Sequence, residues 1–254
     1  MGFFTGNRPW VIAHRGLSLN AVENTLDAFR AALLAGATHL ETDVQASRDH
    51  QAFLWHDSDL TRLTGRSVRV AELSADELGS IDLGGGSRIV TLEQALLTFP
   101  DARFNIDVKD ARCAAAVVDV IRRTDSTDRV LITSFSRARR RLVSNALRSV
   151  AVSPAAAEVL AIIVVARFAG TKALLRACRG FQAVQVPEFY GPLRLITPLI
   201  VRKLHRIGVE VHVWTVDDPD DMKRLLDMGV DGIVTNRSDL LAFVAHGQKQ
   251  PREP

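Results

Sequence analysis

The sequence predicts an α/β fold, a (β/α)8 TIM barrel with a small insertion after the second strand and its hairpin. Eight short apolar runs, typical of buried strands, alternate with longer helix-like segments along the 254 residues, as such a barrel requires. Polar residues follow these runs at their carboxyl ends, where barrels of this kind hold their active sites. A doubly wound open sheet is the alternative, but no glycine-rich dinucleotide motif follows the first run.

The composition fits one globular domain, which we place at residues 1–246. Of all residues, 47% are hydrophobic and 24% are charged, and α/β barrels reach this length as single domains. No window approaches the ~18 consecutive apolar residues of a membrane span. The first residues also lack the basic start and apolar stretch of a secretory signal. Residues 247–254 are predicted to be a disordered tail.

The cysteines and the charge balance bear on location and partners. Cys113 and Cys178 show no metal-ligand spacing, so we expect reduced, buried thiols in a cytoplasmic protein. The net charge of +3 is small, and we expect no nucleic-acid partner. The basic run at 137–141 is typical of a solvated helix face. Weak contact with an anionic membrane surface or a phosphate-bearing partner is the alternative. The sequence leaves the oligomeric state open.

The first half of the chain shows the clearest change of hydrophobic period. β-Branched and apolar runs mark the strands, and apolar residues three and four apart mark the helices. Gly36 ends the first helix, and Thr91 caps the start of a later one. Residues 57–90 break this rhythm with polar, glycine-punctuated sequence, and we interpret them as the small insertion. The predicted elements are a strand at 10–13, a helix at 24–34, a strand at 38–44, its hairpin return at 52–55, a short helix at 74–78 and a helix at 91–97.

The second half alternates more regularly between strand and helix. Its strands are short apolar runs, and Pro219 marks the start of the seventh repeat's helix. The predicted strands are 103–108, 130–133, 149–152, 183–186, 209–215 and 232–235. The predicted helices are 111–122, 137–147, 154–167, 171–177, 198–206, 219–228 and 239–246.

The strand at 38–44 carries Glu41 and Asp43 two residues apart. Because side chains at i and i+2 of a strand share a face, both carboxylates point the same way. The hairpin then returns to His56 and brings an imidazole toward this pair. Taken alone, the pair is better explained as a surface strand with solvated acids. The groups at the other strand ends reverse that interpretation.

Those groups suit phosphodiester hydrolysis. Strand ends carry His14, Arg15, Asp107, Lys109 and Trp214, and they meet at one mouth in a barrel. With Glu41 and Asp43, Asp107 completes three carboxylates, a hard donor set that suits one divalent cation, Mg²⁺ or Ca²⁺. Arg15 and Lys109 provide positive charge for phosphate. His14 and His56 provide a base and an acid near neutral pH.

These motifs resemble the glycerophosphodiester phosphodiesterase family. The matching stretches, in family order over nearly the whole chain, are His14-Arg15-Gly16, Glu23-Asn24-Thr25, Glu41-Thr42-Asp43-Val44, His56-Asp57, Asn105-Ile106-Asp107-Val108-Lys109, Val213-Trp214-Thr215-Val216 and Gly232-Ile233-Val234-Thr235-Asn236. The resemblance implies a metal-dependent barrel that hydrolyses small glycerophosphodiesters to glycerol 3-phosphate and an alcohol. It implies that His14 and His56 are the acid–base pair and that Glu41, Asp43 and Asp107 bind the metal. It further implies that Arg15 and Lys109 contact phosphate and that Trp214 lines the substrate pocket.

Three positions depart from the family pattern. Asp107 stands where the family usually has Glu, Asp217 where it often has Asn, and Val90 where it usually has Pro. Two other functions stay open. One is a phosphodiesterase of the lysophospholipase D or sphingomyelinase D type, although toxins of that kind are secreted and disulfide bonded. The other is a barrel without catalysis that binds phosphoryl ligands, against which the intact histidines and carboxylates argue.

Overall fold

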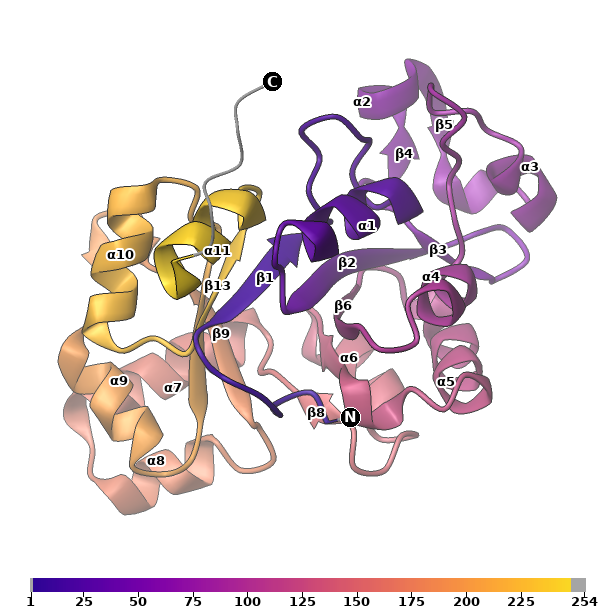
Figure 1. Ribbon diagram of the computed structural model, residues 1–254. Coiled ribbons are helices and arrows are strands. Elements are labelled where there is room, and N and C mark those ends of the chain that lie inside the picture. The colour runs from indigo at the N-terminus through magenta and orange to yellow at the C-terminus, as the bar shows by residue number, and fades with distance from the viewer. Residues whose placement is uncertain (1, 248–254) are drawn as a thin grey trace.

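The chain forms a nearly closed barrel of parallel strands (Figure 1). We describe residues 2–247 of a computed structural model. Within them, eight strands run parallel, as the alternation predicts. In chain order these are β1 (Trp10–His14), β2 (His39–Ala46), β6 (Arg103–Val108), β7 (Val130–Thr133), β8 (Ala151–Val152), β9 (Ala183–Pro187), β12 (Glu210–Trp214) and β13 (Gly232–Thr235).

The order of the strands confirms the barrel and excludes the doubly wound sheet. Except for β8 and β9, each barrel strand pairs with its successor along the chain, and β1 pairs with β13, so the first and last repeats are neighbours. The remaining seam lies between β8 and β9. It is bridged by a backbone bond from Gln182 to Val152 (3.3 Å) and by a bond from the Val152 amide to the Gln182 side chain (2.9 Å). The seam thus depends partly on a side chain because β8 is only two residues long.

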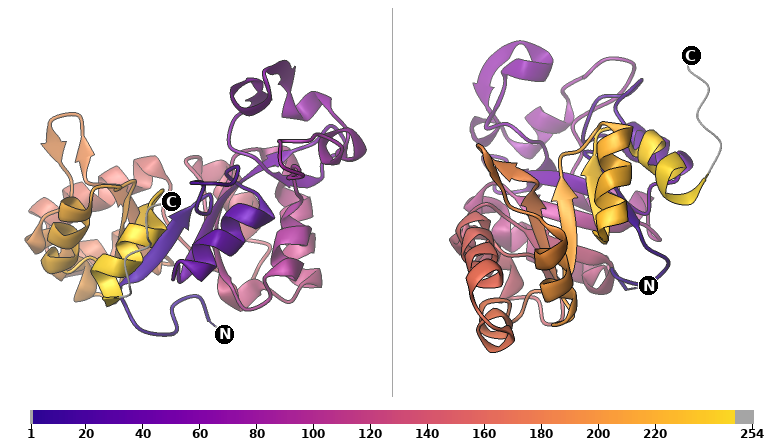
Figure 2. Two further views of the ribbon diagram at one scale, coloured as in Figure 1. Left: turned by 45° about the horizontal axis from the view of Figure 1, so that its top comes forward. Right: turned by 90° about the vertical axis from the view of Figure 1, so that its left-hand side faces the viewer.

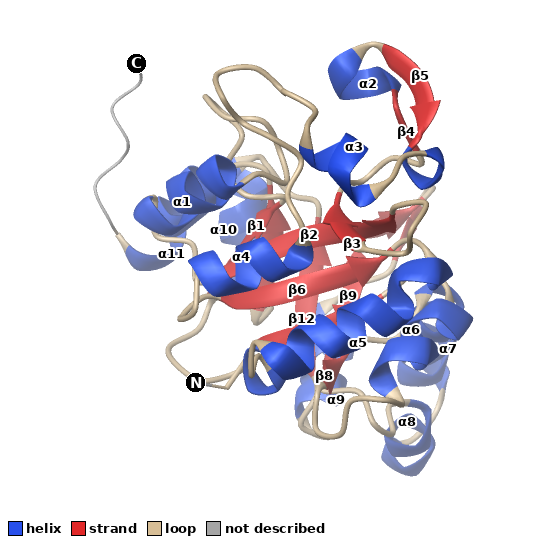
Figure 3. Ribbon diagram, turned by 90° about the vertical axis from the view of Figure 1, so that its right-hand side faces the viewer, coloured by secondary structure: helices blue, strands red, loops and turns tan. Residues whose placement is uncertain are grey.

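Helices surround the barrel (Figure 3). Their ends follow the expected capping chemistry: Thr91 Oγ1 accepts the Gln94 amide (3.1 Å), and Pro219 occupies the first helical position of α10. The covering helices are α1 (Leu26–Leu34), α4 (Leu92–Thr98), α5 (Ala114–Arg123), α6 (Arg137–Ser144), α7 (Ala156–Phe168), α8 (Thr171–Ala177), α9 (Pro198–His205), α10 (Pro219–Met228) and α11 (Ser238–His246). Short 3-10 turns, η2 (Ala111–Cys113) and η3 (Thr127–Arg129), precede α5 and β7.

The two faces of β2 separate as its sequence predicts. Leu40 and Val44 belong to the apolar layer between strands and helices, whereas Glu41 and Asp43 point into the barrel. Both acids are nevertheless buried. The apolar core therefore lies mainly between the strands and the helices, whereas the barrel interior holds these acids together with small apolar clusters that include Trp10, Ile12 and Leu131.

The predicted hairpin and insertion lie on one side of the barrel mouth (Figure 1). Strand β3 (Ala52–Leu54) pairs antiparallel with β2. The insertion then forms a two-stranded sheet and short helices over a small apolar cluster of its own, which includes Trp55, Leu60 and Leu78. Its elements are β4 (Asp59–Leu60), α2 (Thr61–Thr64), β5 (Arg66–Arg69), η1 (Val70–Glu72) and α3 (Ala75–Gly79).

Several predicted bounds move, and a hairpin outside the insertion is new. The predicted strand 149–152 is two residues long, and the helix predicted at 137–147 ends at Ser144. A small hairpin, β10 (Phe189–Tyr190) and β11 (Leu193–Arg194), follows β9. It was not predicted because strands of two residues leave no period to detect.

Other expectations concern the cysteines, the chain end and membrane spans. Cys113 and Cys178 are free and buried, as predicted. Burial raises the pKa of the Cys113 thiol to about 12. Apart from Gly247, the predicted tail lies outside the described residues. Across residues 2–247, none of the helices combines the length and apolarity needed to cross a bilayer.

His39 makes stability depend on pH. It is fully buried, with ring contacts to Phe3 and Trp10, and its Nε2 bonds to the Phe3 carbonyl (2.9 Å). Burial lowers its pKa to about 3. As the pH falls, His39 is therefore protonated in the unfolded chain before it is protonated in the folded one. The stability contributed by the neutral ring is thus lost as the pH falls below 6.5. We expect His39 to account for a loss of about 2 kcal/mol in unfolding free energy between pH 7 and pH 5.

Urea unfolding at both pH values checks this. His39→Phe should show a loss between pH 7 and pH 5 that is smaller by that amount, whatever its stability at pH 7. His50→Gln is the control, because His50 lies on an exposed turn. The same pH dependence in His39→Phe and in the unsubstituted protein would contradict the prediction.

Candidate active site

The carboxyl ends of the barrel strands surround a cavity of about 340 Å³. Every residue that the sequence predicts for the site lines it: His14, Arg15, Glu41, Asp43, His56, Asp107, Lys109 and Trp214. They come from β1, β2, β6 and β12 and from the loops that follow β1, β3 and β6. The topology thus brings together residues that are up to 200 positions apart in the sequence.

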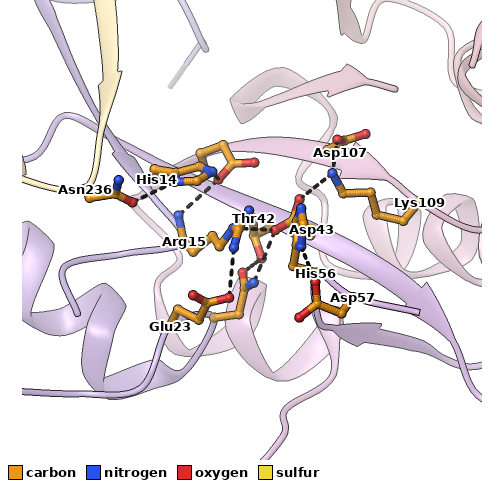
Figure 4. Close-up of polar contacts among 12 residues, drawn as sticks. His14, Arg15, Glu23, Thr42, Asp43, His56, Asp57, Asp107, Lys109 and Asn236 are labelled. Atoms are coloured by element: carbon orange, nitrogen blue, oxygen red, sulfur yellow. Dashed lines mark hydrogen bonds and ion pairs between the residues drawn. The ribbon is translucent and has the colours of Figure 1, made fainter. Parts of the chain in front are cut away.

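Asp43 lies at the centre of the charged groups (Figure 4). Lys109 Nζ lies 3.0 Å from Asp43 Oδ1 and 2.7 Å from Asp107 Oδ2, and Arg15 Nε lies 3.0 Å from Asp43 Oδ2. Burial opposes ionisation of Asp43, but Lys109 and Arg15 outweigh it and lower the pKa of this carboxyl. Asp43 is therefore ionised at neutral pH.

Glu41 and Asp107 behave differently. Burial, followed by repulsion from Asp43 and Asp107, raises the pKa of Glu41 well above its usual value. Burial also raises the pKa of Asp107, although the neighbouring Lys109 opposes this. Three carboxyl groups thus crowd one buried region with less positive charge than their full ionisation requires.

The donor chemistry of this region fits a hard divalent cation. All donors are oxygens, and Asp107 Oδ1 and the neighbouring Asn105 Oδ1 are buried without a hydrogen-bond partner among the described residues. A cation would relieve the repulsion that raises the pKa of Glu41. Within residues 2–247, the side chains of His, Cys, Asp and Glu form no group of three that lies close enough together to hold a metal ion. The match between this region and a divalent cation therefore rests on the oxygen donors, the excess negative charge and the oxygens that lack a hydrogen-bond partner.

His14 is held by a short polar chain. Its Nδ1 lies 2.8 Å from Asn236 Oδ1, and Asn236 Nδ2 donates to Asp217 Oδ2 (2.7 Å). Because the amide nitrogen is committed to Asp217, Asn236 presents its oxygen and His14 Nδ1 carries the proton. Burial, together with Arg15, lowers the pKa of His14. Its Nε2, 4.0 Å from Glu41 Oε2, is thus a free acceptor.

His56 is oriented by its sequence neighbour. Its Nδ1 lies 2.7 Å from Asp57 Oδ1, while Gln45 Nε2 donates to the carbonyl groups of His56 and Asp57 (3.1 and 3.0 Å). Arg62 Nε donates to the other Asp57 oxygen (2.6 Å). With Nδ1 engaged, Nε2 is left for chemistry in the cavity.

The motif order, the cavity and the barrel agree with one known family. Residues 14–240 match the model of the glycerophosphoryl diester phosphodiesterase family. The chain belongs to this family. A probable glycerophosphodiester phosphodiesterase 2 of Mycobacterium tuberculosis is 42% identical over 93% of this chain and 91% of its own length.

Two further similarities support the family and its barrel. A glycerophosphodiester phosphodiesterase of Caldanaerobacter subterraneus is 30% identical over 91% of this chain and 95% of its own. Among solved structures, a phosphodiesterase of Oleispira antarctica in complex with the product sn-glycerol-3-phosphate superposes with a TM-score of 0.75. That match covers 93% of this chain and 96% of the other at 22% identity, which supports the fold.

Arg62 contacts two carboxylates that orient cavity residues, and the sequence did not indicate this role. Its Nη2 lies 2.6 Å from Glu23 Oε1, and the same Glu23 oxygen accepts from Arg15 Nη1 (2.9 Å). Arg62 therefore contacts two carboxylates: Glu23, which orients Arg15, and Asp57, which orients His56. No local spacing predicts a contact between residues 39 positions apart.

The turn after β1 depends on backbone conformations that favour few residues. Gly16 has φ +84°, and a Cβ there would lie 2.7 Å from the backbone carbon of Ala28 on α1. Asn24, also at positive φ (57°), donates to Asp43 Oδ2 (3.3 Å) and accepts from Thr42 (2.7 Å). This turn thus fixes the position of Arg15 and supports Asp43 from a third side.

One wall of the cavity is apolar. The rings of Phe135 and Trp214 meet edge to face with centroids 5.8 Å apart, and Lys109 Nζ lies 5.3 Å from the Phe135 centroid. Leu160 and Tyr190 extend this wall outward. The site therefore combines a charged floor with an apolar side.

A histidine that shares a strand face with Trp214 does not reach the mouth. The side chain of His212 is fully buried in the barrel and bonds to Glu210 Oε2 (3.1 Å). Its depth depends on where the strand begins within the barrel, which local sequence does not define.

Arg62 provides a test of this charge network. Arg62→Ala should lower kcat for phosphodiester hydrolysis by about 10- to 100-fold, because both Arg15 and His56 lose their orientation. Arg62→Lys should recover little, since one ammonium cannot bridge both carboxylates as a guanidinium does. Steady-state kinetics measure both effects.

Arg66→Ala is the matched control, since Arg66 is an exposed arginine of the same insertion. It should retain the unsubstituted rate. If Arg62→Ala is as active as Arg66→Ala, the network has no part in positioning the site.

Proposed function

We propose that this protein hydrolyses glycerophosphodiesters to glycerol 3-phosphate and an alcohol. The observation that carries the proposal is the single cavity that joins two oriented histidines, three carboxylates, Arg15 and Lys109. The name of its 42%-identical relative and the glycerol 3-phosphate bound to a structural neighbour support it. As a member of the family, the protein is a phosphoric diester hydrolase.

In this proposal, Glu41, Asp43 and Asp107 hold one divalent cation, Mg²⁺ or Ca²⁺. When bound, the cation supplies positive charge that polarises the phosphoryl group. Arg15 and Lys109 contribute the protein's own positive charge to the substrate phosphate. Both are prepositioned by the acids they already contact: Arg15 by Glu23 and Asp43, Lys109 by Asp43 and Asp107. Trp214 and Phe135 form the apolar side of the pocket.

The histidines have separate roles in the proposed reaction. The lowered pKa of His14 and its free Nε2 suit a general base. It takes the proton of the attacking hydroxyl as the new P–O bond forms, while His56 gives a proton to the leaving alkoxide as the old P–O bond breaks. The attacking group is either water or the adjacent glycerol hydroxyl, which would give a cyclic phosphate first.

A second substrate class is favoured by the apolar wall of the cavity. Phe135, Leu160 and Tyr190 offer an apolar surface to an acyl chain, so lysophospholipids are candidate substrates from which the head group would be released.

The alternative of a barrel that only binds phosphoryl ligands predicts that no substrate is turned over. We place the enzyme in the cytoplasm, in keeping with its buried free thiols.

Metal removal tests the role of the carboxylates. EDTA should abolish release of glycerol 3-phosphate from glycerophosphocholine, and excess Mg²⁺ or Ca²⁺ should restore it. Asp43→Ala should lose metal binding, measured by calorimetry, together with most turnover. Full activity of the metal-free enzyme would remove Glu41, Asp43 and Asp107 from this role.

Leaving-group dependence tests the histidines. A choline alkoxide is strongly basic and needs a proton donor, whereas a nitrophenolate hardly needs one. His56→Ala should therefore be severely impaired on glycerophosphocholine but recover much of its relative rate on a nitrophenyl phosphodiester. His14→Ala should stay impaired on both substrates.

The comparison of the two variants is its own control, because both lose an imidazole at the same cavity. Recovery in His14→Ala instead of His56→Ala would exchange the roles. Recovery in neither would mean that another group protonates the leaving alkoxide.

A further inference from the structure

Helix α7 exposes apolar side chains where a surface helix normally carries polar ones. Its inner face packs Val159, Ile162 and Ile163 into the core. Its outer face nevertheless presents Val164, which is 57% exposed, and Phe168, which is 81% exposed. The helix is thus apolar on both sides, and its outer side faces solvent.

The apolar surface continues to the mouth of the cavity. Arg167 Nη1 donates to the Arg194 carbonyl (3.4 Å), which connects α7 to the β10–β11 hairpin. Phe189 on that hairpin is 52% exposed, and Leu160 of α7 and Tyr190 of the hairpin both line the cavity. Figure 2 shows the hairpin, in orange, projecting beyond the barrel. We call α7 and this hairpin together the apolar face.

The segment that contains the apolar face is strongly basic. Residues 136–206 hold 13 Lys and Arg but 2 Asp and Glu, while the whole chain holds 32 and 29. The rest of the chain is therefore net acidic. Helices α8 and α9 pack against α7, and α6 is tied to it by Arg137 and Arg140 through Glu158 (3.1 and 2.9 Å). Exposed basic residues in this segment are Arg137, Arg141, Arg148, Arg167, Lys172, Arg176, Arg179, Arg202 and Arg206.

We propose that the apolar face docks on the surface of an anionic phospholipid bilayer. Apolar side chains bordered by Lys and Arg are the chemistry that inserts among lipid head groups and attracts anionic ones. Leu160 and Tyr190 belong to both the face and the cavity lining, so docking brings the cavity mouth to the bilayer. The enzyme then meets diesters where lipid breakdown releases them.

Charge argues against a second copy of this chain as the occupant. A symmetric dimer buries the same patch on both subunits, so the basic residues around one apolar face would meet those around the other. Such juxtaposed like charges oppose association. An anionic bilayer instead complements both the apolar centre and the basic border.

Vesicle binding tests the proposal without any need for catalysis, so it does not depend on the proposed reaction. The full chain should co-sediment with vesicles of equal parts phosphatidylglycerol and phosphatidylcholine at low salt, and much less with phosphatidylcholine alone. The double variant Val164→Ser/Phe168→Ser should bind at least about tenfold more weakly, since two exposed apolar groups no longer enter the bilayer. Lys172→Glu/Arg176→Glu should also bind more weakly.

The matched control is Leu34→Ser/Leu97→Ser, which removes two exposed leucines, 83% and 61% exposed, from α1 and α4. It should bind like the unsubstituted protein, and all three double variants should keep their thermal midpoints and their turnover of soluble substrate. Three results would overturn the proposal: no binding to the anionic vesicles, equal binding by the Val164→Ser/Phe168→Ser variant, or sedimentation of a dimer that this variant dissociates.

Discussion

The ionised Asp43 is the group on which the site depends. It is buried, and burial of an isolated carboxylate is costly unless opposite charge and hydrogen bonds compensate. Arg15 and Asn24, from the loop that follows β1, and Lys109, from the loop that follows β6, provide that compensation. Lys109 and Arg15 are thereby held at the cavity, so the contacts that stabilise the charge also place the two cations that we propose to contact the substrate phosphate.

Positive and negative groups then alternate away from Asp43 to the insertion. Arg15 contacts Glu23, Glu23 contacts Arg62, and Arg62 contacts Asp57, which orients His56. The insertion is thus part of the site as well as a cover beside it. Such a network gives geometric precision, because the position of each side chain is determined by two neighbours of opposite charge.

The molecule also divides its surface by charge and polarity. The acids of the cavity come from β2 and β6 in the first half of the chain, whereas the basic helices and the apolar face come from residues 136–206. The cavity lies where these two parts meet, which gives it a charged floor and an apolar wall. A diester with a polar phosphate and a less polar alcohol matches that division.

Local sequence by itself determined the parallel strand–helix repeats, the shared face of Glu41 and Asp43, and the gathering of polar residues at strand ends. These follow from periods of two and 3.6 residues and from the rule that barrel sites lie at strand carboxyl ends. Tertiary structure decided the contacts of Arg62, the depth of His212, the β10–β11 hairpin and the union of α7 with the cavity mouth. Each of these depends on register, burial depth or packing between distant segments. Such relations leave no periodic pattern of hydrophobic residues in the sequence from which they could be predicted.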